Sequence, residues 1–191
     1  MLGSSPRRSA RDAAYIGLSV ALLAVCAWIA VPVSVGTPIT LQTMGLCATV
    51  GLLGGRRGTI AVGIYLLMGA LGLPVFAGFG AGAGVLVGVT GGYLWGMLPA
   101  AAVMGGVLFV LSRRTATGRI SFGGYMASFV LGVVTCYLAG TAWFIMLYAP
   151  ETGADGAVAA ILSCTVPYLA PDALKCLLAA RLCRTLRGRV A

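Results

Sequence analysis

The sequence contains no histidine, a single lysine and only four acidic residues, and charged residues make up 9% of its 191 positions. A soluble domain carries about 25% charged residues, so this composition is far from that of an ordinary globular protein. None of the six cysteines forms a CxxC pair. Without histidine or paired cysteines, a structural zinc site or a metal-activated water is disfavoured. We therefore expect no metal and no cofactor, and we interpret the cysteines as small hydrophobic residues.

The sequence is rich in apolar residues: 60% of its residues are hydrophobic and the mean hydropathy is +1.01. One protein core could not hide so many apolar residues, so lipid must cover the excess. This indicates an integral membrane protein with very short loops. A secretory signal is not expected, because the first apolar run is long and lacks an obvious small-residue cleavage site.

The net charge of +9 would suggest nucleic acid in a soluble protein, but its distribution argues otherwise. The twelve arginines form four groups, each at the end of an apolar stretch, as topology determinants do. No aromatic residues are interleaved with them, so we expect no nucleic-acid binding. The groups are Arg7, Arg8 and Arg11; Arg56 and Arg57; Arg113, Arg114 and Arg119; and Arg181, Arg184, Arg187 and Arg189.

Six apolar segments predict an all-α fold with six transmembrane helices. Two of them, 39–54 and 59–71, are short for a full span, which needs about 20 residues. We expect a tail at 1–12, one membrane domain at 13–187 and a second tail at 188–191. The predicted segments are 13–31, 39–54, 59–71, 85–111, 122–147 and 171–186.

An even number of spans places both termini on one side of the membrane, together with all twelve arginines. Glu151 and Asp155 then fall on the other side. Because positive loops stay in the cytoplasm, we predict that both termini are cytoplasmic. The predicted loops at 32–38, 72–84 and 148–156 are then external.

Asp172 and Lys175 stand out because they fall inside the last apolar segment, where a charge costs roughly 2.5–3.5 kcal/mol on insertion scales. Three residues apart, they share one helix face. They could only neutralise each other, or Lys175 could bind a carboxylate or phosphate while Asp172 accepts hydrogen bonds from N–H donors. An enzyme is disfavoured, because this pair supplies no nucleophile, metal or second acid–base group.

The outer half of the membrane domain also holds Gln42, the glycine-rich loop 74–84 with Phe76, and the segment 90–93. This predicts a pocket open to the outside for a small, mostly apolar molecule with one anionic end. Gln42 could instead cap a helix. Four aromatic residues are candidates for contacting the ligand body or, alternatively, for packing the core: Phe76, Phe79, Tyr93 and Tyr168.

No nucleotide motif and no second set of intramembrane charges supplies an energy source, so the chain is interpreted as the binding subunit of a larger transporter or as a facilitator. Ala13, Gly17 and Ala21 recur at four-residue intervals and predict a smooth face on the first helix. Such faces let another helix approach closely. The neighbour could be a partner protein or another helix of the same chain.

Several of these motifs together resemble the BioY family, the biotin-specific S components of energy-coupling factor (ECF) transporters. The resemblance covers about residues 13–187. The motifs are Thr40-Leu41-Gln42-Thr43, Gly72-Leu73-Pro74-Val75-Phe76-Ala77-Gly78, Thr90-Gly91-Gly92-Tyr93-Leu94 and Pro167-Tyr168-Leu169-Ala170-Pro171-Asp172-Ala173-Leu174-Lys175.

The resemblance implies an S-component fold in the bacterial cytoplasmic membrane, an external biotin pocket, and partners in a transmembrane T component and two ABC-type ATPases. It implies that Lys175 holds the valerate carboxylate, and that Asp172 accepts from a ureido N–H or orients the lysine. The segment 90–93 would line the bicyclic ring. The implied substrate-binding residues are Gln42, Thr43, Phe76, Gly78, Thr90, Gly91, Gly92, Tyr93, Asp172 and Lys175, and the implied partner face is Ala13, Gly17 and Ala21.

Two positions depart from the family pattern. Some relatives carry an asparagine at Gly78, and a proline is expected at Val89. The alternatives to biotin capture are an S component for a different carboxylate-bearing vitamin and a structural membrane subunit. Some family members occur without the energising module, so transport by this chain alone stays a further possibility.

Overall fold

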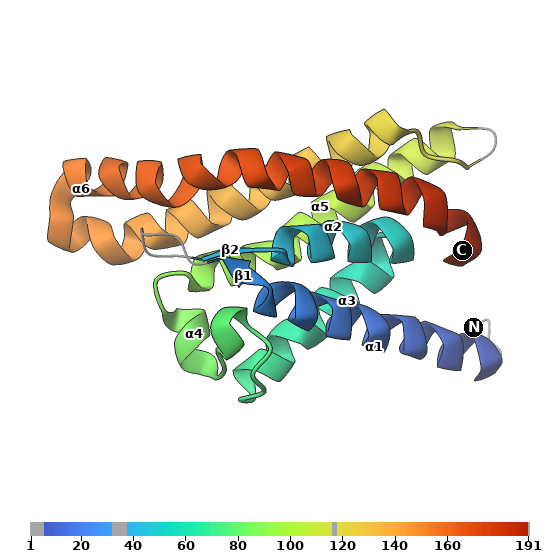
Figure 1. Ribbon diagram of the computed structural model, residues 1–191, viewed down its shortest axis with the longest axis horizontal. Coiled ribbons are helices and arrows are strands. Elements are labelled where there is room, and N and C mark those ends of the chain that lie inside the picture. The colour runs from blue at the N-terminus through green and yellow to red at the C-terminus, as the bar shows by residue number, and fades with distance from the viewer. Residues whose placement is uncertain (1–5, 32–37, 116–117, 191) are drawn as a thin grey trace.

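The computed structural model describes residues 6–31, 38–115 and 118–190, with side-chain surroundings given for 9–31, 38–115, 118–147, 162 and 165–187. The predicted tail ends 1–5 and 191, and the predicted loop 32–38 apart from Pro38, lie outside this part. The described elements are helical apart from one short antiparallel ribbon (Figure 1). They are α1 Pro6–Trp28, β1 Ala30–Val31, β2 Ile39–Thr40, α2 Gln42–Leu53, α3 Gly55–Ala70, the 3-10 turn η1 Ala77–Phe79, α4 Ala83–Val87, α5 Gly91–Arg114 and α6 Phe122–Val190.

Helix α6 folds back on itself, so that its two arms lie side by side and antiparallel (Figure 1). Residues 122–147 lie in the first arm and residues 165–187 in the second. Helices α2 and α5 pack against these arms, and α1 and α3 pack on α2 and α5 in turn. Within the described residues, α1, α2, α3, α5 and the two arms of α6 thus follow one another in the predicted order. The start of α1 and the end of α6 lie at the same end of the molecule (Figure 1).

Three segments of the described chain are long and apolar enough to cross a membrane: Ser9–Trp28, Gly91–Arg114 and Phe122–Leu147. Helix α2 is apolar but shorter. The described part of the second arm of α6 is not among these segments, and it carries Asp172, Lys175 and three arginines. The number of spans and the side on which the termini lie therefore stay predictions.

Several predicted helix boundaries were wrong. The first helix spans Pro6–Trp28 where 13–31 was predicted, and the third begins at Gly55 where 59 was predicted. Two further differences are larger. Residues 85–111 do not form one helix, because α4 ends at Val87 and α5 begins only at Gly91. Residues 148–156 were expected as a loop and the last helix was expected to start at Pro171, yet the backbone of both regions is assigned to α6. Proline is tolerated inside a membrane helix when neighbouring groups satisfy the freed carbonyl.

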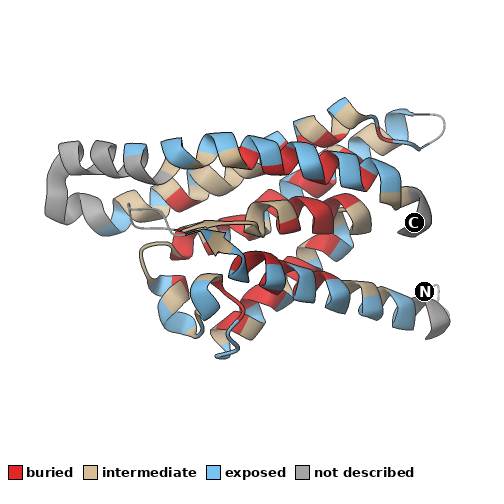
Figure 2. Cartoon of the chain, viewed as in Figure 1, coloured by how far each residue is buried: buried red, intermediate tan, exposed pale blue. Residues whose placement is uncertain are grey.

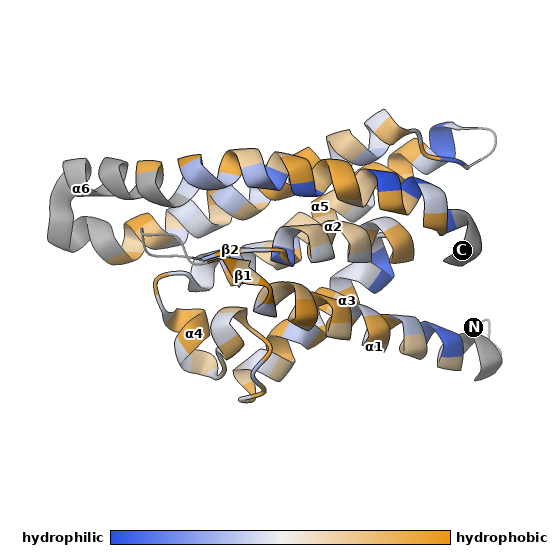
Figure 3. Cartoon of the chain, viewed as in Figure 1, coloured by the Kyte–Doolittle hydropathy of each residue, from blue (hydrophilic) through white to orange (hydrophobic). Residues whose placement is uncertain are grey.

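The core is a continuous set of buried residues between α1, α2, α3, α5 and the α6 arms, while the outer faces are exposed (Figure 2). Many exposed side chains are large and apolar, among them Leu18, Leu138 and Met146. Hydrophilic residues gather at the end of the molecule that holds both termini (Figure 3). This is the distribution that a lipid-covered bundle with one charged end requires.

Two local features place the start of α2, which carries Gln42 and Thr43. Residues Ala30 and Val31 pair with Thr40 and Ile39, and the Leu41 N–H donates to Ile29 O. The far end of α2 turns at Gly54, whose positive φ of 80° suits glycine. Helix α2 is therefore fixed at both ends.

Helices α3 and α5 cross at Gly55 and Gly105, and a Cβ on Gly105 would overlap the Cα of Gly55. We expect Gly105→Ala to destabilise the protein by about 1–3 kcal/mol, because the added methyl group forces the helices apart. Gly106 is the matched control, since nothing lies within 4 Å of a Cβ placed there. Thermal denaturation of the purified protein in detergent should show a lower midpoint for Gly105→Ala and no decrease for Gly106→Ala. Equal midpoints for the two variants would contradict this packing.

Candidate ligand-binding site

Asp172 and Lys175 form a buried ion pair on the second arm of α6. Lys175 Nζ lies 2.6 Å from Asp172 Oδ1, and the two residues are 7% and 6% exposed. Their three-residue spacing puts both on one helix face, as the sequence predicted. Either charge alone would be strongly destabilising in such surroundings, so each depends on the other.

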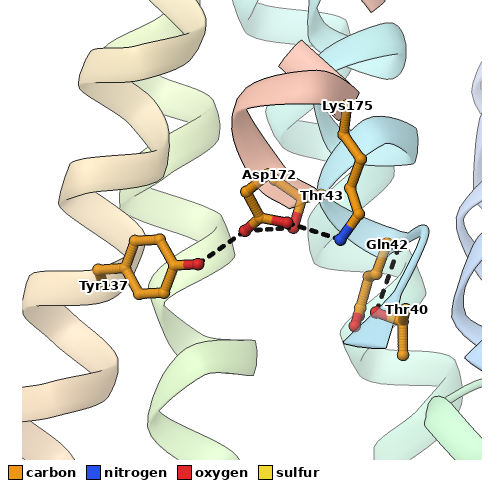
Figure 4. Close-up of polar contacts among 6 residues, drawn as sticks. All are labelled: Thr40, Gln42, Thr43, Tyr137, Asp172 and Lys175. Carbon is orange, nitrogen blue, oxygen red and sulfur yellow. Dashed lines mark hydrogen bonds and ion pairs between the residues drawn. The ribbon is translucent and has the colours of Figure 1, made fainter. Parts of the chain in front are cut away.

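Two hydroxyl groups from other segments also reach Asp172 (Figure 4). Thr43, in the first turn of α2, donates to Asp172 Oδ2 at 3.3 Å. Tyr137, on the first arm of α6, donates to the same oxygen at 2.8 Å. The carboxylate therefore joins α2 and both arms of α6 at one point.

A cavity of about 370 Å³ lies beside this network and has Asp172, Thr43 and Tyr137 in its wall. Its size is within the range of small-molecule sites, about 300–1,000 Å³. Seven of the ten predicted binding residues line it: Gln42, Thr43, Phe76, Gly78, Thr90, Tyr93 and Asp172. The predicted aromatic candidate Tyr168 lines it as well.

Three predicted binding residues are not among the lining residues. Gly91 and Gly92 are buried where helices touch, because a Cβ on Gly91 would overlap Leu86 O and one on Gly92 would overlap the Trp143 side chain. These glycines let α5 pack on α4 and α6. Lys175 directs its ammonium to the Asp172 carboxylate. A contact of these three residues with a ligand stays a prediction.

Gln42 is the first residue of α2, but its side chain does not cap that helix. Instead, Nε2 lies 3.0 Å from Tyr65 Oη, and the residue lines the cavity. Of the two roles that the sequence left open, the position of Gln42 favours contact with a ligand.

The glycine-rich loop brings Phe76 and Gly78 to the cavity. Phe76 is buried and packs edge-on against Tyr65, with ring centroids 5.6 Å apart. Gly78 has a φ of 63° and a ψ of 28°, a left-handed conformation in which glycine and asparagine are favoured. The same conformation would accept the asparagine that the family resemblance led us to consider at this position. Phe79 does not line the cavity and stacks on Trp28 at 5.1 Å.

Sequence reasoning missed several lining residues, of which Tyr137 matters most. A tyrosine hydroxyl inside an apolar span needs a polar partner, and that signal could have singled out Tyr137. The other lining residues are mostly apolar and carry no such signal. The residues missed are Pro38, Thr40, Leu46, Ala77, Val85, Leu94, Met97, Val133, Cys136 and Tyr137.

The wall of the cavity combines a large apolar surface with a few fixed polar groups, which suits a small, mostly apolar molecule with one polar end. The part of the chain that the structure describes holds no group of three or more potential metal ligands. Four of the described cysteines are buried: Cys26, Cys47, Cys176 and Cys183.

The predicted partner face lies elsewhere on the molecule. Ala13, Gly17 and Ala21 are exposed on α1 and border an apolar groove of about 460 Å³ together with Ile64 and Met68 of α3. No atom lies within 4 Å of a Cβ placed on Gly17. The smooth face is therefore not used for packing inside the described chain.

Comparison with known proteins identifies the relatives of this fold. The model of the BioY family matches residues 4–191. The biotin transporter BioY of Thermotoga maritima is 44% identical over 124 residues, covering 65% of this chain and 68% of that protein. The biotin transporter BioY of Rhodobacter capsulatus is 34% identical over 181 residues, covering 92% and 93%.

A solved structure shares the architecture. It is the crystal structure of the S-component for biotin from an ECF-type ABC transporter, with a TM-score of 0.83 and 25% identity. The match covers 97% of this chain and 95% of that one. The predicted all-α, S-component-like membrane fold is thereby confirmed.

The buried pair generates a stability prediction. Asp172→Asn should destabilise the protein by about 3–5 kcal/mol, because it leaves the Lys175 charge without a partner. Adding Lys175→Met should recover much of that loss. The exposed pair of Arg57 and Asp12, 3.0 Å apart, provides the control.

Asp12→Asn should cost about 0–1 kcal/mol, because solvent screens a surface ion pair. Unfolding in mixed micelles, followed by circular dichroism, measures all four proteins. If the double variant were less stable than Asp172→Asn alone, the two side chains would not be coupled as described.

Proposed function

Because this chain belongs to the BioY family, we propose that it captures biotin at the external face of the membrane and serves its uptake as the substrate-binding subunit of an ECF-type transporter. It is a multi-pass membrane protein, and the family is one of transporters, so the interpretation as a non-enzyme is confirmed. The observation that carries the proposal is the cavity of about 370 Å³, closed on one side by the network around Asp172.

The geometry bears on which end of biotin meets this network. The family resemblance implied that Lys175 holds the carboxylate, and that Asp172 accepts from a ureido N–H or orients the lysine. With Nζ and Oδ1 only 2.6 Å apart, both side chains face the same end of any ligand. Asp172 and Lys175 therefore cannot each bind a different end of biotin.

The ureido end fits this pair better than the carboxylate end. A urea presents N–H donors beside a carbonyl acceptor, which match a carboxylate beside an ammonium group. A ligand carboxylate would instead face the negative charge of Asp172 at close range. Lys175 can serve both partners, because its ammonium has three donors and one goes to Asp172. We therefore assign the ring end to this network, with Phe76, Thr90 and Tyr93 around the ring.

Calorimetry with biotin and its uncharged amide tests this assignment. Lys175→Ala should weaken both ligands by a similar factor, roughly 10- to 100-fold, because a charge-assisted hydrogen bond to the common ureido group is lost. Arg57→Ala, which removes a cation from an exposed pair, should change neither. If Lys175→Ala weakened biotin alone, Lys175 would bind the carboxylate. If the unmodified protein did not bind biotin, the proposed function would be wrong.

The proposal extends to orientation and partners. Hydrophilic residues at the end that holds both termini support cytoplasmic termini, a membrane domain over about 13–187 and an external cavity (Figure 3). We propose association with a transmembrane T component and two ABC-type ATPases. The exposed small-residue face of Ala13, Gly17 and Ala21 supports a close helix–helix contact there.

Gly17→Leu tests the contact face. The branched side chain should abolish co-purification of the T component and ATPases expressed with this chain, because it holds the partner helix away. Biotin affinity should not change, since Gly17 does not line the cavity. Gly106→Leu, also at an exposed helical glycine with no atom nearby, is the control and should keep its partners. Retention of the partners by Gly17→Leu would rule out this face.

A further inference from the structure

Gln42 is held by a buried tyrosine from another helix. Its Nε2 atom lies 3.0 Å from Tyr65 Oη and 3.3 Å from Met97 Sδ. Tyr65, on α3, is completely buried and is not among the residues that line the cavity. Any effect of Tyr65 on a ligand must therefore pass through its neighbours.

The hydroxyl of Tyr65 fixes which way the Gln42 amide points. Tyr65 Oη lies 2.9 Å from Val75 O, and a carbonyl can only accept, so the single hydroxyl hydrogen is used there. Towards Gln42 the hydroxyl can then only accept. The amide must present its NH₂ group to Tyr65, and the weakly accepting sulfur of Met97 favours the same orientation. The amide oxygen consequently points away from Tyr65.

Because Gln42 lines the cavity, we infer that Oε1 is the atom that it offers to a ligand as an acceptor. Among the described residues no hydrogen bond is formed to it, and Gln42 lines the cavity. Gln42, Thr43 and Asp172 line the same cavity, so one ligand can reach both the amide and the carboxylate. In Figure 4 the Lys175 ammonium lies between the Asp172 carboxylate and the Gln42 side chain in this view.

We propose that Tyr65 is a positioning residue that locks Gln42 as a hydrogen-bond acceptor, and that the site therefore selects ligands with an N–H donor at this place. This inference rests on the proposed function, because it concerns the same cavity. The cyclic urea of biotin carries two N–H donors, one for Asp172 and one for Gln42. A ring whose nitrogens bear no hydrogen leaves the Gln42 acceptor unpaired and is rejected.

The same hydroxyl joins this selection to the loop above the cavity. Val75 O, which accepts from Tyr65, directly precedes Phe76, and the Phe76 ring packs edge-on against Tyr65. Tyr65 thus has two effects on the cavity. It orients the amide of Gln42, and it positions the Phe76 ring in the apolar wall. Tyr65→Phe keeps the ring and its contact with Phe76, so it removes the first effect and preserves most of the second.

A double-mutant cycle with calorimetry separates the two effects. Gln42→Met and Tyr65→Phe should each weaken biotin binding by roughly three- to tenfold, because each removes one oriented hydrogen bond. The double variant should be no weaker than Gln42→Met, since Tyr65 acts through Gln42. Tyr125→Phe is the matched control: it removes another buried hydroxyl, one that contacts Arg187, and should leave affinity unchanged.

Additive losses in the double variant would overturn the positioning role, because a purely structural effect of Tyr65 does not depend on Gln42. Should Tyr65→Phe fail to fold, Gln42→Met is measured with biotin and with biotin methylated on its ureido nitrogens. The preference for unmethylated biotin must then shrink several-fold, and an unchanged preference overturns the inference. If the unmodified protein did not bind biotin, the proposed function would be wrong as well. Additive decreases in affinity in the double variant would overturn only the positioning role of Tyr65.

Discussion

The site depends on one electrostatic constraint: the carboxylate of Asp172 and the ammonium of Lys175 are buried together in an otherwise apolar bundle. A buried charge is tolerated only when it is paired and hydrogen-bonded. Lys175 supplies the opposite charge from the same helix, while Thr43 and Tyr137 supply hydroxyl donors from α2 and from the first arm of α6. Satisfying this one carboxylate brings together α2 and both arms of α6, which supply part of the cavity wall.

A second polar cluster completes the wall on the α3 side. Tyr65 connects Gln42 at the start of α2 with Val75 in the glycine-rich loop. The break between α4 and α5 places Thr90 and Tyr93 at the cavity. Gly91 and Gly92 lack side chains and so let the start of α5 lie against α4 and α6. Rigid helices thus carry the polar groups, and a short loop with Phe76 and Gly78 covers the apolar part.

Much of this was predictable from the sequence, because rare residues are informative in an apolar chain. A lone lysine three residues after an aspartate predicts a buried pair, and the same composition predicts a lipid-covered bundle. Tyr137 and Tyr65 were not predicted as site residues. Tyr137 bonds to Asp172, 35 positions away, and Tyr65 bonds to Val75, 10 positions away, and both contacts depend on how the chain packs. The start of α5 at Gly91 was also missed, because no proline marks the break.

The central claim is that the cavity beside Asp172 holds one molecule of biotin. Native mass spectrometry of the protein, purified from cells grown with biotin, tests this most directly, with a Thr43→Trp variant whose indole would fill the cavity. The account predicts one biotin per chain in the unmodified protein and none in the variant. A different bound molecule, or biotin retained equally by Thr43→Trp, would contradict it.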